Sequence, residues 1–184
     1  MRATHLVARF FESLRAKPLG AADTAWVAAA LEPAELRVWN GMSDADRAEG
    51  TAVARRLDDT LATTPDATGA DTTWRAAALL HDAGKQLSGY GTIGRATVTV
   101  VATVAGKERA RGWARSHRPV YARMGRYLAH DDLGAVLLRD MGARPEVAAW
   151  AEAHHRPERW TGTGIPIAVC RALAAADGEP TRPD

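Results

Sequence analysis

The sequence predicts an all-α fold, in which a helical bundle follows a shorter helical segment at the N-terminus. Alanine is abundant, whereas the 184 residues contain only two Phe and three Tyr, a composition that favours helix over sheet. Apolar residues recur at three- and four-residue steps, as they do on the buried face of a helix. Glycine and proline separate these segments, which indicates many helices of moderate length.

The spacing of apolar and capping residues defines the individual elements. We predict helices over 4–16, 22–31, 33–40, 44–62, 71–81, 96–104, 118–128, 131–141, 145–154 and 166–177. Two of these helices have clear starts, because Ser43 or Asp44 and Asp71 are favourable N-cap residues. The four glycines of residues 84–94 predict a loop between two helices.

Residues 96–104, ATVTVVATV, have the alternation of Thr and Val that is typical of a β-strand. An isolated strand in an otherwise helical chain would have no partner for its backbone hydrogen bonds. We therefore predict a helix here, against the local propensity.

We divide the chain into three parts. Residues 1–42 are expected to form an N-terminal helical extension that packs on the core and carries no recognisable chemistry. Residues 43–178 are expected to form the main domain, and residues 179–184 a flexible tail. The length suits one hydrophobic core.

Charge and composition exclude several classes of protein. Lys and Arg number 24 against 22 Asp and Glu, and this near-neutral balance indicates no nucleic-acid partner. The single Cys170 rules out an internal disulfide and fits a reducing cytoplasm. No apolar run approaches the roughly 20 residues that span a bilayer. The charged N-terminus does not resemble a signal peptide, so we expect a cytoplasmic protein without membrane contact. Nothing in the sequence indicates an oligomeric state.

The chemistry is concentrated in the segment LLHDAGK, where an apolar helix ends in His81 and Asp82. Buried His and Asp side chains are costly unless they are paired or hold a metal ion. Four further residues of these types lie at or near predicted helix ends: His130, His154, His155 and Asp177. Imidazole and carboxylate ligands together suit zinc, iron, manganese or another divalent cation. Their spacing alone leaves open whether these side chains converge or are scattered.

LLHDAGK resembles the signature of the HD-domain superfamily of metal-dependent phosphohydrolases, which has an all-α fold. The resemblance extends in the family's order over about residues 43–177, through His130-x-x-x-Gly134-Ala135, Ala153-His154-His155 and Ala175-Ala176-Asp177. It implies one or two divalent metal ions (zinc, manganese or iron). The ligands that it implies are His81, Asp82, His130, His154 (or His155) and Asp177.

One ligand of the family is replaced. The resemblance implies a His on the helix before the HD segment, but residues 43–62 contain none, and Glu49 is the nearest substitute. Glu49 either binds the metal, which would favour a harder ion, or pairs on the surface, which would leave one metal position weak. The segment HHRPERWTGTGIP is also similar to part of the cyclic-di-GMP phosphodiesterases of this superfamily. Because Arg156 and Ile165 depart from their motif, we infer shared architecture and not a shared substrate.

The resemblance implies a metal-activated water that attacks a nucleotide or another small phosphorylated metabolite. Asp82 and Lys85 would be the catalytic residues, and Lys85 would also bind a phosphate oxygen unless it is an ordinary helix-end cation. The seven basic residues within 107–126 would attract such a substrate, or would form a plain solvated face. The remaining substrate-binding candidates are His117, Arg118 and Trp160, although each also has a structural explanation at the surface or in the core.

Two other functions remain open at this point. A catalytically degenerate HD module would bind a nucleotide or a partner without turnover, and the missing His favours it. A di-iron oxygenase would use the same ligands for oxygen chemistry, as some members of the superfamily do. Metal content and phosphate release distinguish the three.

Overall fold

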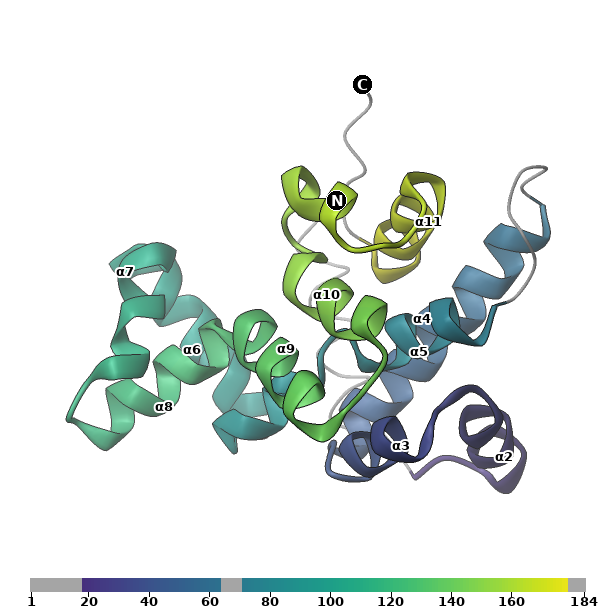
Figure 1. The fold of residues 1–184 in the computed structure, drawn as a ribbon. Helices are drawn as coiled ribbons and strands as arrows, with labels where there is room; N and C mark the ends of the chain where they lie inside the picture. Colours follow the sequence, from purple (N-terminus) through teal and green to yellow (C-terminus); the bar gives the residue numbers. More distant parts are fainter. Residues whose placement is uncertain (1–17, 64–70, 179–184) are drawn as a thin grey trace.

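Helices and the short turns that join them make up the residues that the structure, a computed structural model, describes: 18–63 and 71–178. Figure 1 shows a central group of helices with a lobe of further helices beside it. This architecture confirms the predicted all-α fold. The helix predicted over 4–16 and the predicted tail at 179–184 lie outside the described residues. None of the helices described is long and apolar enough to cross a membrane.

Two helices form the centre of the core, α4 (Asp44–Ala62) and α5 (Thr72–Leu80). Both begin at the predicted caps. The Ser43 hydroxyl accepts a hydrogen bond from a backbone N–H in the first turn of α4, and the Asp71 carboxylate does the same for α5. These caps satisfy backbone groups that would otherwise have no partner at a helix start.

Close approach of the two helices depends on a glycine. A Cβ on Gly50 would lie 2.6 Å from the carbonyl oxygen of Leu79, so a larger residue would force α4 away from α5. The residues from Ala76 to Leu80 are fully buried on every side of α5. The helix that leads into His81 is therefore enclosed by its neighbours, and its end is held firmly in the core.

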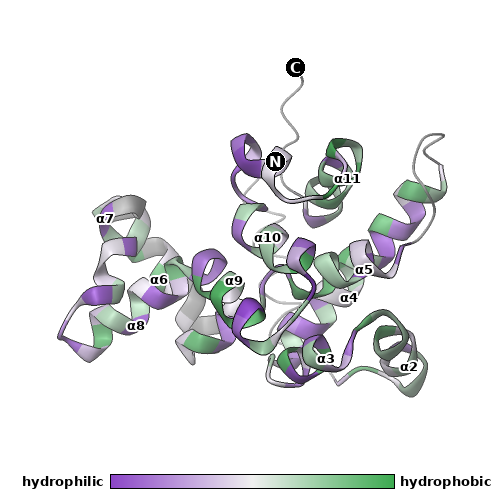
Figure 2. Cartoon of the chain, viewed as in Figure 1, coloured by the Kyte–Doolittle hydropathy of each residue, from purple (hydrophilic) through white to green (hydrophobic). Residues whose placement is uncertain are grey.

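α10 (Pro145–Ala153) and α11 (Ile167–Asp177) pack on this pair, and α9 (His130–Met141) packs on α10. α10 lies against α5 and α9, and α11 lies against α4. The 3₁₀-helix η3 (Pro157–Gly162) joins α10 to α11. In Figure 2, α11 is mainly hydrophobic, whereas the connection from α10 carries hydrophilic residues. Cys170 is buried within α11 as a small core residue.

The first described helices, α2 (Ala21–Ala30) and α3 (Pro33–Asn40), cover one end of this core. Glu35 of α3 is fully buried and accepts hydrogen bonds from Nε (2.9 Å) and Nη2 (2.6 Å) of Arg144, the residue before α10. The same guanidinium donates to the carbonyl oxygen of Ala30 at 2.8 Å. A buried bidentate ion pair thus ties both helices to the start of α10.

The chain between α5 and α9 forms the lobe and its base. Its elements are η1 (Ala83–Ser88), α6 (Thr92–Ala105), α7 (Lys107–Arg111), η2 (Gly112–Arg115) and α8 (Pro119–Leu128). Figure 1 shows α6, α7 and α8 projecting to one side of the central helices. The 3₁₀-helix η1 packs on α9 and α8, so it connects the lobe to the core.

Two local predictions for this chain segment have different outcomes. Residues 96–104 lie within α6, which confirms the helix predicted against the β propensity. The loop predicted over 84–94 is wrong, because η1 continues the chain from Ala83 and α6 begins at Thr92. The glycines of this segment do not keep the chain from forming helices, and one of them, Gly89, ends η1. Gly89 closes η1 with a left-handed φ of 63°, which glycine adopts without steric cost.

We predict that Glu35→Gln lowers the free energy of unfolding by about 3 kcal/mol near neutral pH, since Arg144 loses its buried counter-charge. Burial raises the pKa of Glu35, but hydrogen bonds and charge from Arg144 outweigh this and hold the pKa below its ordinary value. The contribution of the carboxylate is therefore complete above the unfolded pKa of about 4.3 and is lost as the pH falls through the folded pKa.

Urea unfolding of both proteins from about pH 7 to about pH 3 checks this prediction. The difference in unfolding free energy should shrink as the solution becomes more acidic. A difference that stays constant over this range would contradict the ionised state of Glu35.

Candidate metal centre

The ends of four helices bring the predicted His and Asp residues together. His81 follows α5 as its C-cap, and His154 follows α10 in the same way. His130 is the first residue of α9, and Asp177 is the last residue of α11. At a helix end the side chain is free to turn into the space between neighbouring helices, which explains how residues far apart in the sequence converge.

Three of the imidazoles have the same tautomer and orientation. In each of them Nδ1 lies within hydrogen-bonding distance of the carbonyl oxygen three residues earlier. The pairs are His81 with Ala78 (2.8 Å), His130 with Tyr127 (2.9 Å) and His154 with Ala151 (2.9 Å). Because a carbonyl oxygen only accepts, Nδ1 must carry the proton, and Nε2 of the neutral ring keeps a lone pair. These three Nε2 atoms are buried, and within residues 18–63 and 71–178 none of them makes a hydrogen bond of good geometry.

The carboxylate of Asp82 lies between two of these rings. Its Oδ2 is 3.3 Å from Nε2 of His81, and its Oδ1 is 3.2 Å from Nε2 of His130. Asp177 completes this side, with Oδ1 3.5 Å from Nε2 of His81. The two oxygens of Asp82 therefore face different imidazoles, which is the arrangement that a bridging carboxylate requires.

The electrostatics keep both carboxylates ionised. Burial raises the pKa of Asp82, but the charges of Lys85 and His81 outweigh it and hold that pKa well below the ordinary value. Burial likewise opposes the ionised form of Asp177, and His81 lowers its pKa. Burial disfavours protonation of His81, yet Asp82 and Asp177 raise its pKa well above the ordinary value. The two carboxylates therefore favour a proton or another cation at Nε2 of His81.

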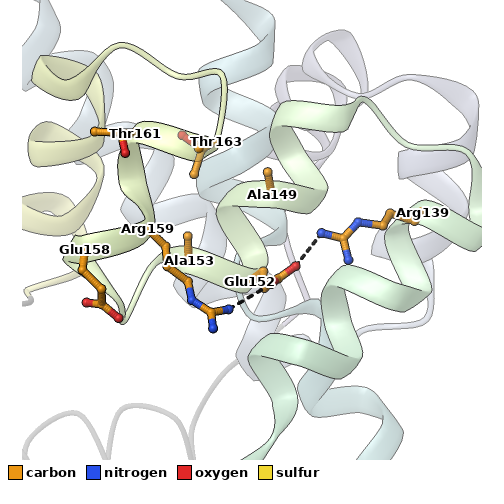
Figure 3. Close-up of a pocket in the computed structure, with 9 residues that line it drawn as sticks. Arg139, Ala149, Glu152, Ala153, Glu158, Arg159, Thr161 and Thr163 are labelled. Carbon is orange, nitrogen blue, oxygen red and sulfur yellow. Dashed lines mark hydrogen bonds and ion pairs between the residues drawn. The ribbon is translucent and has the colours of Figure 1, made fainter.

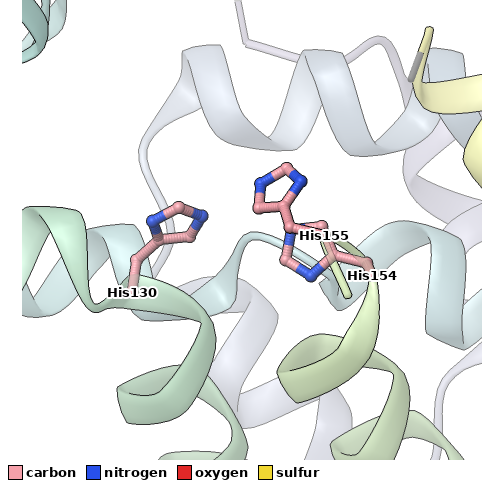
Figure 4. A group of neighbouring side chains, drawn as sticks. All are labelled: His130, His154 and His155. Carbon is pink, nitrogen blue, oxygen red and sulfur yellow. The ribbon is translucent and has the colours of Figure 1, made fainter. Parts of the chain in front are cut away.

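A second group of donors lies next to the first. Ligand nitrogens of His130, His154 and His155 all lie within 4.8 Å of one another (Figure 4). Burial, followed by the neighbouring His155 and His81, holds the pKa of His154 well below its ordinary value, so this ring is in its neutral, metal-binding form. His155 is exposed, and its ring centroid is 3.9 Å from that of His154. The sequence leaves a choice between His154 and His155 as a ligand, and the structure brings both side chains into the cluster.

These residues fit a divalent metal ion. A buried acceptor without a partner costs about 1–3 kcal/mol, and Nε2 of His154 is such an atom among the described residues. Nε2 of His81 and Nε2 of His130 face the ionised Asp82 carboxylate, where a lone pair is unfavourable and a cation is favourable. A cation bound to the imidazole nitrogens and the ionised carboxylates would remove both costs. The mixed N and O donors suit zinc, iron or manganese, as the sequence predicts.

Glu49, the predicted substitute for the missing His, is half-buried on α4. Its Oε1 lies 3.4 Å from Nη2 of Arg56, while Nε of Arg56 donates to the carbonyl oxygen of Ala176 at 2.6 Å. Glu49 is therefore linked through one arginine to the end of α11, next to Asp177. This ion pair is the surface alternative that the sequence analysis considered, and metal ligation by Glu49 stays a prediction.

Lys85 contacts the centre directly, since its ammonium group pairs with Oδ2 of Asp82. Burial lowers the pKa of Lys85, but Asp82, with smaller contributions from Tyr127 and Asp46, raises it above the ordinary value. Nothing in the local sequence marks Tyr127 or Asp46 as contributing to the charge around this lysine. Asp46 accepts a hydrogen bond from the Ser43 hydroxyl at 2.7 Å, and the sequence does show this capping pattern.

The other predicted substrate residues do not join the metal ligands. His117 and Arg118 are exposed at the start of α8, whereas His130 follows its far end, and a helix of 10 residues spans about 15 Å. Trp160 is only 6% exposed. Its indole N–H donates to the carbonyl oxygen of Ala153 at 3.1 Å, and its ring packs on Trp150 at 5.8 Å. Trp160 is thus part of the core, and the predicted stacking on a substrate base is not supported.

A pocket of about 400 Å³ opens between α10 and η3, apart from these histidines (Figure 3). Arg139 and Arg159 both pair with Glu152 at its wall. Its lining includes Ala153, the residue before His154, but none of the predicted metal ligands. The pocket therefore adds no residue to the proposed metal ligands.

Comparison with protein families agrees with this geometry. The HD domain matches residues 49–182, which is well over half of the chain. The chain belongs to the HD-domain family. No curated protein and no solved structure matches it. Membership confirms the resemblance read from LLHDAGK and points to the superfamily of metal-dependent hydrolases. The three-part division at 1–42, 43–178 and 179–184 stays a prediction.

The glycine of the HD-domain segment has a specific steric role. A Cβ on Gly84 would lie 1.9 Å from the carbonyl oxygen of His130 and 2.6 Å from the backbone nitrogen of Gly134. The backbones of η1 and α9 are thus in direct contact beside Asp82. This contact determines how closely Asp82 approaches His130.

We predict that Gly84→Ala destabilises the protein by about 2–3 kcal/mol, because the added methyl group forces two backbones apart. Displacement of His130 from Asp82 should also weaken zinc binding. Urea unfolding and zinc titration measure the two effects. Gly112→Ala is the matched control, since a Cβ there meets nothing within 4 Å and should change neither quantity. A Gly84→Ala variant with unchanged stability would contradict the steric argument.

Proposed function

We propose that this HD-domain protein is a metal-dependent phosphohydrolase that acts on a nucleotide or another small phosphorylated metabolite. The observation that carries the proposal is that the ionised carboxylate of Asp82 lies 3.3 Å from Nε2 of His81 and 3.2 Å from Nε2 of His130, with the neutral ring of His154 beside both. One or two divalent ions (zinc, manganese or iron) would bind here. The proposed ligands are His81, Asp82, His130, His154, His155 and Asp177, with Glu49 as a further candidate.

When bound, the metal would supply Lewis acidity and a water of lowered pKa. Asp82, with an oxygen toward each of two imidazoles, would orient the ligands and hold negative charge at the centre. Lys85 keeps its proton, because Asp82 raises its pKa despite burial, so it is suited to bind a phosphate oxygen and unsuited to act as a base. A positive charge held in this position would stabilise the charge that develops on a phosphoryl group.

A specific observation also favours the second candidate, a binding module without turnover. The ammonium group of Lys85 pairs with Asp82 and compensates its charge without a metal. Such a module would bind a nucleotide or a partner at the same place. The di-iron oxygenase remains a third candidate, since the donor set is also compatible with iron.

The proposal predicts one or two equivalents of zinc, manganese or iron in the purified protein, and phosphate release from a nucleotide or a small phosphate ester. Asp82→Ala should lose the metal and reduce kcat/KM by more than about 100-fold, because it removes a proposed ligand and not merely a neighbour of one. Elemental analysis and a phosphate-release assay over a substrate panel measure both effects.

Asp140→Ala is the control for this experiment, since Asp140 is an exposed carboxylate on α9. Full metal content in the Asp82→Ala variant would refute the proposed centre. A wild-type protein without metal that still binds nucleotides would favour the binding module. Two irons with oxygen consumption and no phosphate release would favour the oxygenase.

Glu49→Gln tests the replaced ligand separately. If Glu49 is a ligand, as we propose, the variant should lose occupancy of one ion, because a neutral amide binds a divalent cation more weakly than a carboxylate. Asp58→Asn is the matched control on the same helix. It also replaces a paired carboxylate with an amide, by removing the ion pair with Arg75, and it should leave the metal content unchanged. Unchanged metal stoichiometry in Glu49→Gln would show that Glu49 is not a ligand and would support its surface role in the ion pair with Arg56.

A further inference from the structure

Four charged side chains form a network beside the histidines. Asp131 and Asp132 follow His130 at the start of α9, Arg111 ends α7, and Arg156 follows His155. The contacts are Arg156 Nη2 to Asp131 Oδ2 (2.8 Å), Arg156 Nη1 to Asp132 Oδ1 (2.7 Å), Arg111 Nη2 to Asp131 Oδ1 (2.8 Å) and Arg111 Nη2 to Asp132 Oδ2 (2.8 Å). Each guanidinium therefore binds both carboxylates.

Asp131 is the buried member on which the network is centred. Its side chain is 1% exposed, and its Oδ1 accepts from Arg111 while its Oδ2 accepts from both Arg111 and Arg156. The two arginines balance the two aspartates in charge. Burial of such a network costs desolvation that hydrophobic residues of similar volume would not incur. The network therefore has a stronger claim to fixing the geometry of the chain segments that it joins than to raising the stability of the fold.

The positions of Asp131 and Arg156 in the chain connect the network to the proposed ligands. Each is the next residue after a histidine of the cluster, Asp131 after His130 and Arg156 after His155. Their ion pair thus joins the start of α9 to the turn that leaves α10, which are the two elements that supply these histidines. Metal coordination tolerates deviations of only about 0.2 Å, so a rigid link between the two backbones bears directly on affinity.

We infer that Asp131 and Arg156 are positioning residues of the metal centre, which hold His130 in register with His154 and His155. Neither side chain needs to touch the ion. Arg111 extends the same network to α7, so the lobe is fastened to the start of α9 at this point. The inference rests on the proposed metal site and assigns a role to residues outside its ligand set.

The structure offers a matched control for simple loss of stability. Glu35 and Arg144 form a second buried bidentate pair, which joins α3 to the start of α10 and touches none of the histidines. Removal of either arginine leaves a buried carboxylate short of its partner, and both changes should destabilise the fold. Only removal of Arg156 should alter the metal centre.

The experiment is a Co²⁺ titration of metal-free protein, followed by its visible absorption spectrum, with urea unfolding in parallel. Arg156→Met keeps the length of the side chain without its charge, and should weaken Co²⁺ affinity by about 10-fold or more and change the spectrum. Arg144→Met should lower stability but keep wild-type Co²⁺ affinity and spectrum. Arg156→Lys keeps the charge but loses the bidentate geometry, so it should weaken affinity less than Arg156→Met.

Wild-type affinity and spectrum in Arg156→Met would overturn the inference while leaving the proposed centre intact. Equal effects of Arg156→Met and Arg144→Met would also overturn it, because they would show a general effect of stability. If Arg156→Met does not fold, Arg156→Lys decides, and unchanged affinity there overturns the inference. A wild-type chain that binds no Co²⁺ would overturn the proposed function itself, and the positioning role with it.

Discussion

The centre depends on one repeated interaction, the hydrogen bond between Nδ1 of a histidine and the carbonyl oxygen three residues earlier in the chain. Each such bond uses a backbone acceptor from the turn that precedes its histidine, and it fixes both the tautomer and the direction of the ring. His81, His130 and His154 share it. The remaining features of the fold bring these three chain segments to a common point and hold them there.

Close backbone packing and buried ion pairs together hold the three histidine-bearing segments at this common point. Gly50 lets α4 approach α5, and Gly84 lets η1 touch α9, so the chain on both sides of His81 is positioned by contacts between backbones. Arg144 and Asp131 then join elements that are distant in the sequence through charged hydrogen bonds. Backbone contact of this kind leaves little freedom, because neither partner has a side chain that can change rotamer.

The sequence was sufficient where the determinants are local. Helical periodicity, the caps at Ser43 and Asp71, and the HD motif correctly predicted the all-α class and most helices after residue 20. The sequence was insufficient where the role of a side chain depends on its contacts with residues that are distant in the sequence. Trp160 has the same local signature whether it packs on Trp150 or faces a ligand, and the partners of Asp131 are 20 and 25 residues away. The helix over 83–88 was missed because glycines that permit close packing look like glycines of a loop.

The pairing of Lys85 with Asp82 has a consequence for the way in which the centre is assembled. The chain supplies its own counter-ion, so the buried carboxylate is compensated as soon as η1 and α5 are in place. Asp82 would hold a divalent cation only in place of the Lys85 ammonium group, and not as a bare negative charge. Lys85 would then be available to an anionic ligand only where such a cation takes over the charge of Asp82, so the two sites would be linked through this one carboxylate.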